Sequence, residues 1–215
     1  REVMKILAVG GGSGGHVTPV VAVFKEILKK NRKAELRFWC DKKFLPQAEK
    51  TMKSAFGEKV KISSIHSGKL RRYNHLTLLQ HFTIPSVVFG NIADFFKNIL
   101  GVFQAFFKLI FWRPDVIFCK GGFVCVPAGL AAWALRIPIV IHDSDAHPGL
   151  ANRILSKFAR KIATGAPLEF YNYPAEKTQY VGIPILENFK KYRPAEREEF
   201  KKQLGFSPRK PVVMI

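Results

Sequence analysis

The chain has few cysteines and few acidic residues. Of its 215 residues only 3 are Cys, and 16 are Asp or Glu against 35 Lys or Arg. The three cysteines, Cys40, Cys119 and Cys125, show no metal-ligand or C-x-x-C spacing, and an odd number forms no complete disulfide framework. This pattern indicates a reducing compartment such as the cytosol.

The shortage of acidic residues leaves a formal net charge of +19 at pH 7. Such a charge predicts an anionic partner. The sequence has no aromatic RNP-type strand, helix-turn-helix signature or zinc knuckle, and its basic residues are spread along the chain. Nucleic acid is therefore not expected as the partner, and an anionic membrane surface is favoured.

Hydrophobic residues make up 47% of the chain, enough for a buried core. The pattern alternates between short apolar runs and helical periodicity. This alternation predicts an α/β fold with a parallel, doubly wound, Rossmann-like sheet. The expected strands are 3–9, 35–40, 60–65, 116–119 and 137–141, and the expected helices are 20–30, 45–54, 126–135 and 149–158, with helical patterns over 76–112.

A glycine-rich turn from Gly10 to Gly15 separates the first expected strand from the first helix. Glycines let the backbone approach a phosphate, and the helix N-terminus attracts negative charge. With Asp41 at the end of the next strand, the run also satisfies a dinucleotide fingerprint. That fingerprint does not explain His16, which is either a surface histidine or a neutral base at the helix N-terminus.

Two further polar turns follow later strands. Gly121 and Gly122 come after the strand 116–119, and the loop 142–145 comes after the strand 137–141. Each is by itself consistent with an ordinary turn or a capping loop. Because carboxyl ends of parallel strands meet at one edge of a sheet, the sequence predicts that these turns and His16 line one crevice. Glycine turns, a histidine and carboxylates suit transfer chemistry on a diphosphate substrate.

The segment 91–112 is unusually apolar for a helix of a soluble domain. Its polar residues form one narrow stripe, consisting of Asp94, Lys97, Asn98, Gly101, Gln104 and Lys108. The charges interrupt the run too often for a membrane span. Two interpretations remain: a helix buried between the sheet and its neighbours, or a helix that also offers its apolar side to a bilayer interface.

Four motifs, in order, resemble those of the MurG family of N-acetylglucosaminyltransferases. They are GGSGGHVTP at 11–19, SGKLRR at 67–72, KGGFVCVP at 120–127 and HDSDAHPGLAN at 142–152. The resemblance implies a GT-B architecture of two Rossmann-like domains. Residues 1–181 would form the N-terminal acceptor- and membrane-binding domain, and 182–215 a linker, a crossing helix near 195–204 and the first strand of the donor-binding domain.

The resemblance also implies an activity. Members transfer GlcNAc, with inversion, from UDP-GlcNAc to lipid I, the undecaprenyl-diphospho-muramoyl pentapeptide, giving lipid II for peptidoglycan. Such a protein would be peripheral on the cytoplasmic face of the cell membrane and would contact anionic lipid through the 91–113 helix and nearby Lys and Arg residues. Other cell-wall synthesis proteins would be further partners. No tightly bound cofactor or metal is expected, and UDP-GlcNAc would be the donor substrate.

Site roles transfer by position in the motifs. Asp145 stands where many relatives have a donor-contacting asparagine, and Leu186 stands where many have a donor-contacting arginine. The implied roles are catalytic for His16 and Asp143, donor-binding for Ser13, Gly14, Gly15 and Asp145, and acceptor-diphosphate-binding for Gly121, Gly122, Phe123, Arg71 and Arg72.

Two other functions remain open from the sequence. One is a non-catalytic subunit of a split GT-B enzyme that binds the acceptor and recruits a partner to the membrane. The other is an NAD-dependent oxidoreductase, which the Gly10-x-Gly12-x-x-Gly15 spacing with Asp41 favours.

Overall fold

The structure, a computed structural model, describes residues 3–69, 84–145, 147–186 and 192–212. The chain divides into two compact units, Arg1–Ile185 and Leu186–Ile215. The first unit is an α/β domain, which confirms the fold class predicted from the sequence.

The first unit is built on a parallel sheet of seven strands in the order β3-β2-β1-β4-β5-β6-β7. Their apolar sequences fit strands that are covered on both faces. The strands are β1 (Lys5–Gly10), β2 (Glu35–Cys40), β3 (Val60–Ser64), β4 (Val116–Gly121), β5 (Ile139–Asp143), β6 (Lys161–Thr164) and β7 (Thr178–Tyr180).

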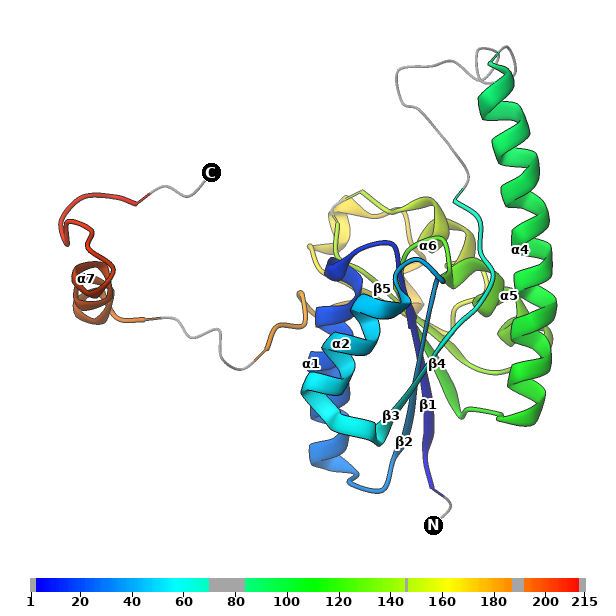
Figure 1. The fold of residues 1–215 in the computed structure, drawn as a ribbon, viewed down its shortest axis with the longest axis horizontal. Coiled ribbons are helices and arrows are strands. Elements are labelled where there is room, and N and C mark those ends of the chain that lie inside the picture. The colour runs from blue at the N-terminus through cyan, green and yellow to red at the C-terminus, as the bar shows by residue number, and fades with distance from the viewer. Residues whose placement is uncertain (1–2, 70–83, 146, 187–191, 213–215) are drawn as a thin grey trace. The chain divides into compact units, whose positions relative to one another are not determined.

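Helices cover the two faces of this sheet. Figure 1 shows α1 and α2 on one side of the strands and α4 and α5 on the other. The larger core cluster lies on the α4 and α5 side, where Ile117, Ala128 and Leu109 are fully buried. The helices are α1 (Gly14–Lys30), α2 (Leu45–Phe56), α4 (Pro85–Phe111), α5 (Cys125–Ala134) and α6 (Leu150–Leu155), with short 3₁₀ turns η1 (Gly57–Lys59), η2 (Leu168–Phe170) and η3 (Ala175–Lys177).

The strand order reverses direction between β1 and β4. From β1 the chain moves outward through β2 to β3, and then returns to place β4 on the other side of β1. At such a switch point the connections after two adjacent strands diverge and leave a crevice at their carboxyl ends. The two glycine turns follow β1 and β4, so the topology places them side by side at this crevice.

The polar stripe of α4 faces the protein, not the solvent. Asn98 Oδ1 accepts a hydrogen bond from Gly68 N and its Nδ2 donates to Gly68 O, both at 3.0 Å. Gln104 Oε1 accepts from His66 N at 2.8 Å, and Lys108 Nζ donates to Ser64 O at 3.0 Å. The stripe therefore holds the segment that follows β3.

The apolar side of α4 is exposed as a consequence. Phe103 and Phe107 are 59% and 57% exposed, and Phe111 is 88% exposed. The interpretation of this helix as buried between sheet and neighbours is thus wrong. By length and composition alone, α4 is also long and apolar enough to cross a membrane. The exposed apolar face of α4 consists of Phe89, Ile92, Phe95, Phe96, Ile99, Leu100, Phe103, Phe107, Ile110 and Phe111.

The second unit contains α7 (Pro194–Gln203), close to the helix expected at 195–204. Its N-terminus has a capping box in which Glu196 Oε2 accepts from Arg193 N at 2.7 Å. The strand expected to open a donor-binding domain falls largely on 213–215, outside the described residues. The domain assignment of 182–215 stays a prediction.

Gly101 should be indispensable for the packing of α4. A Cβ at this position would collide with the His66 carbonyl and lie 3.1 Å from Pro127 Cβ on α5. We expect Gly101→Ala to lower the free energy of unfolding by about 2–4 kcal/mol, because the backbone carbonyl and the proline ring can move only slightly to make room for the added methyl group. Urea denaturation measures the change. Gly149→Ala, where no atom lies within 4 Å of the added Cβ, is the control and should stay within about 0.5 kcal/mol of the unaltered protein.

Candidate active site

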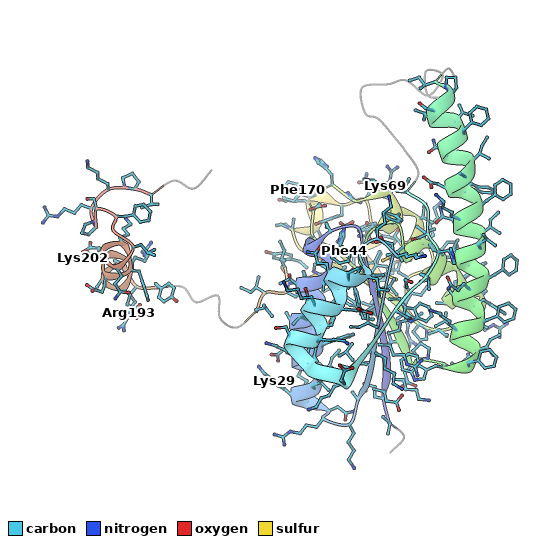
Figure 2. The ribbon with its side chains drawn as sticks, viewed as in Figure 1. Lys29, Phe44, Lys69, Phe170, Arg193 and Lys202 are labelled. Carbon is cyan, nitrogen blue, oxygen red and sulfur yellow. The ribbon has the colours of Figure 1, made fainter. Side chains whose placement is uncertain are left out.

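A cleft of about 1510 Å³ lies at the carboxyl ends of the strands. The glycine turns after β1 and β4, the loop after β5 and the polar stripe of α4 all line it. Phe44 and Lys69, both labelled in Figure 2, also line the cleft. The convergence of the turns predicted from the sequence is confirmed: the cleft-lining site residues are Ser13, Gly15, His16, Gly121, Gly122, Phe123, Asp143 and Asp145.

Asp41 fixes the first glycine turn from behind. Its Oδ2 accepts a hydrogen bond from Gly12 N at 2.9 Å, and its Oδ1 accepts from Phe44 N at 3.1 Å. A Cβ at Gly11 would lie 2.6 Å from the same Oδ2, so only glycine fits there. Asp41 is 6% exposed, and both of its oxygens are occupied. Asp41 therefore holds the turn in place, whereas the dinucleotide interpretation would have this residue bind a ribose hydroxyl.

The second glycine turn packs directly onto the first. Gly121 and Gly122 have φ values of 129° and 89°, which L side chains rarely adopt. A Cβ at Gly122 would lie 2.5 Å from the Gly11 carbonyl oxygen, and one at Gly121 would lie 3.0 Å from His16 Cε1. Glycine at 121 and 122 thus brings two backbone turns and the His16 ring together.

His16 lies in the first turn of α1 with its ring half-buried. Its Nδ1 is buried and has no hydrogen-bond partner in the described part of the chain. Burial and the nearby Lys120 ammonium hold the pKa of His16 below its ordinary value of 6.5, against the opposing effect of Asp145. The interpretation as a surface histidine is wrong, since the ring is half-buried, with its Nδ1 enclosed, and His16 lines the cleft.

His142 anchors the loop after β5. The ring donates from Nε2 to the Gly182 carbonyl oxygen at 2.9 Å, and Nδ1 lies 3.5 Å from Ser144 Oγ. Nε2 must carry a proton, because a carbonyl oxygen only accepts, whereas the Ser144 hydroxyl can donate to Nδ1 or accept from it. Burial is the main cause that lowers the pKa of His142. His142 therefore ties the cleft to the segment where the chain leaves the first unit.

The two carboxylates of the loop differ in environment. Asp143 is 3% exposed, and its Oδ2 accepts a hydrogen bond from Tyr173 OH at 2.8 Å. Burial raises the pKa of Asp143, although the bonds from Tyr173 and Asn152 act in the opposite direction. The side chain of Asp145 is exposed, and its backbone oxygen accepts from Tyr171 OH at 2.7 Å. Asp145 is thus the freer of the two to contact a ligand.

Sequence reasoning did not single out Lys120. This residue is 2% exposed and lines the cleft, where its Nζ donates to Ser144 Oγ at 2.6 Å. The sequence feature that could have identified Lys120 is its position between a buried strand and a glycine turn. Burial lowers the pKa of Lys120, with Asp143 and Asp145 opposing.

Two of the expected site residues, Arg71 and Arg72, lie outside the described residues. Within the described ranges, no group of three or more His, Cys, Asp or Glu side chains has a geometry that holds a metal ion.

The fold and the sequence are those of a glycosyltransferase N-terminal domain. A model of the glycosyltransferase family 28 N-terminal domain matches residues 6–164, and the chain belongs to this family. It is 38% identical over 212 residues to UDP-N-acetylglucosamine--N-acetylmuramyl-(pentapeptide) pyrophosphoryl-undecaprenol N-acetylglucosamine transferase 2 of Bacillus cereus. The aligned region covers 98% of this chain and 53% of the relative. A transferase of the same name from Clostridium kluyveri is 35% identical over 211 residues, with 98% and 53% covered.

Among solved structures, the fold is similar to that of Acinetobacter baumannii MurG. The TM-score is 0.66 at 22% sequence identity, covering 91% of this chain and 49% of that one. The chain spans about half the length of the curated relatives it matches.

The buried histidines should make stability depend on pH. The pKa values of His16 and His142 in the folded state lie below 6.5, so the unfolded chain binds protons first as the pH falls. Their contribution to stability is complete above pH 6.5 and is lost as the pH falls through the folded-state values. Urea denaturation between pH 7.5 and 5 should show a decrease.

The raised pKa of Asp143 acts in the opposite direction, so single variants separate the contributions. His16→Gln and His142→Gln should each flatten the decrease with falling pH, because glutamine does not titrate. An unchanged slope in both variants would show that neither ring is held neutral by folding.

Proposed function

We propose that this chain is the acceptor-binding, N-terminal half of an inverting glycosyltransferase. The enzyme would move GlcNAc from UDP-GlcNAc to lipid I, giving lipid II in peptidoglycan synthesis. The names of the relatives support the substrates. The observation that carries the proposal is the His16 ring, a neutral base with an unpartnered Nδ1, set against two glycine turns in a cleft.

In this proposal His16 acts as the general base. A neutral imidazole takes the proton from the C4 hydroxyl of the muramoyl sugar as its oxygen attacks the anomeric carbon of GlcNAc. The new C–O bond forms while the bond from the anomeric carbon to UDP breaks, so UDP leaves with its electron pair. Asp143 assists by orienting the acceptor. The step needs no redox group, and UDP-GlcNAc is the donor substrate without a tightly bound cofactor.

The glycine turns would bind the charged parts of the substrates. Gly121, Gly122 and Phe123 line the cleft, where the backbone N–H groups of such a turn would suit the acceptor diphosphate, and Arg71 and Arg72 would add charge from outside the described residues. Ser13, Gly14 and Gly15 open α1, whose N-terminus stabilises the developing negative charge on the donor. Asp145, with its exposed carboxylate, would contact the donor sugar.

The exposed apolar face of α4 would bind the cytoplasmic surface of the membrane. The polar stripe of the same helix borders the cleft through Asp94, Lys97 and Asn98. An acceptor on a polyprenyl chain has its sugar in water and its tail in lipid, and α4 presents a matching polar side and apolar side. The net charge of +19 favours anionic lipid, and cell-wall synthesis proteins stay predicted partners.

Replacement of the base tests the reaction. In the full-length protein, including its donor-binding domain, His16→Ala should lower kcat/KM for lipid II formation by roughly 10²- to 10⁴-fold. Because the pKa of His16 lies below 6.5, the acid limb of the unaltered enzyme's pH profile should also lie below pH 6.5.

His147→Ala, on the exposed part of the neighbouring loop, is the control and should leave the rate unchanged. Full activity of His16→Ala would exclude this histidine from the chemistry. Acceptor binding without any GlcNAc transfer by the unaltered full-length protein would favour the non-catalytic subunit.

Vesicle sedimentation tests the membrane surface. Phe103→Ser and Phe107→Ser should each weaken partitioning onto vesicles of anionic phospholipid by about tenfold, since burying one such ring contributes about 1.5 kcal/mol or more. Both side chains are exposed, so the Tm should not change. Phe170→Ser is a matched control, because this phenylalanine is 52% exposed and lies in η2 (Figure 2). Equal binding by all three variants at low salt would contradict the role of α4.

A further inference from the structure

We propose that Lys120 supplies the positive charge that binds a substrate diphosphate at the two glycine turns. The inference rests on the proposed function for the kind of ligand, a sugar-linked diphosphate. Both the donor and the acceptor of that reaction carry such a group, and the shared chemistry is what Lys120 recognises.

Lys120 is a buried cation at the base of the cleft. It is the penultimate residue of β4, directly before Gly121, and is only 2% exposed. Its Cβ lies 3.6 Å from the position that a Cβ on Gly10 would take, so the side chain begins beside the end of β1. The ammonium group nevertheless lines the cleft. A lysine in this position cannot turn its charge out to bulk solvent.

The ammonium group is incompletely paired within the protein. It carries three N–H donors, and in the described part of the chain its one hydrogen-bond partner is Ser144 Oγ at 2.6 Å. No carboxylate of the described residues lies within ion-pair distance of it, and the carboxylate of Asp143 already accepts from Tyr173 OH. Burying a cation without a paired anion is unfavourable, because the group loses its hydration without gaining a counter-charge.

A bound diphosphate would supply the hydrogen-bond acceptors and the negative charge that Lys120 lacks among the described residues. Two N–H donors of Lys120 remain for phosphate oxygens, and the adjoining Gly121 and Gly122 backbone follows the same cleft wall. A bound anion would also offset the desolvation of the ammonium group. Burial is the main cause that lowers the pKa of His16, and the same ammonium group lowers it further, with Asp145 opposing, so Lys120 and His16 act on each other in one cleft.

Inorganic pyrophosphate is the direct probe. Thermal unfolding of the full-length protein is followed with and without pyrophosphate for the unaltered protein, Lys120→Met, Lys120→Arg and the control Lys161→Met, an exposed lysine that starts β6. Pyrophosphate should raise the Tm of the unaltered protein, Lys120→Arg and Lys161→Met, and have no effect on Lys120→Met. An equal rise in all four would overturn the proposal.

The Tm without ligand separates binding from structure. Since Lys120 is buried and incompletely paired, Lys120→Met should have a Tm equal to or above that of the unaltered protein. A large decrease in the Tm of both Lys120→Met and Lys120→Arg would show that the residue serves packing alone, which would overturn the proposal.

Steady-state kinetics distinguish the two sources of the diphosphate. Lys120→Met should raise KM by roughly 10- to 100-fold, as expected for loss of a hydrogen bond to a charged group. KM should rise for UDP-GlcNAc if the donor diphosphate binds at Lys120, and for the lipid-linked acceptor if the acceptor diphosphate binds there. Unchanged KM values for both would overturn the inference and leave the proposed function intact. If pyrophosphate raises the Tm in a Lys120-dependent way but the unaltered protein transfers no GlcNAc, the proposed function is overturned and the inference about Lys120 stands.

Discussion

The contact between the two glycine turns is the constraint on which the rest of the cleft depends. Gly122 lies against the Gly11 carbonyl and Gly121 lies against the His16 ring, so the ends of β1 and β4 approach more closely than side chains would permit. Asp41 holds the first turn in place through Gly12 N. This approach encloses the His16 ring and Lys120, and burial then changes the proton affinities of both groups.

Helix α4 joins the cleft to the surface proposed for lipid. A soluble amphipathic helix normally turns its apolar side to the core. Here the core side combines a few buried apolar residues, such as Leu109, with the polar stripe, in which Asn98 and Gln104 bind the segment after β3. Gly101 lets α5 approach. The apolar side is left outside. One helix thus carries both a cleft wall and an apolar surface, an arrangement suited to a substrate that is part sugar and part lipid.

Much of the fold was predictable because the strands are short, apolar and bounded by glycine or polar residues. The strand 35–40 was placed to the residue, and the starts at 60 and 116 were also correct. The strand β6 was missed, since four residues near the sheet edge carry little periodicity. The helix expected at 149–158 is shorter, spanning Leu150–Leu155.

The sequence by itself determined the order of the elements, the glycine turns and the family resemblance, because these depend on local spacing. It also brought His16, Gly121 and the loop 142–145 to one edge, since parallel topology leaves little choice. Only the tertiary structure decided how each side chain is used. Asp41 holds the first glycine turn, Lys120 is a buried cation, and the polar stripe of α4 contacts the segment after β3. Burial and hydrogen-bond partners of these side chains are set by residues that are distant in sequence.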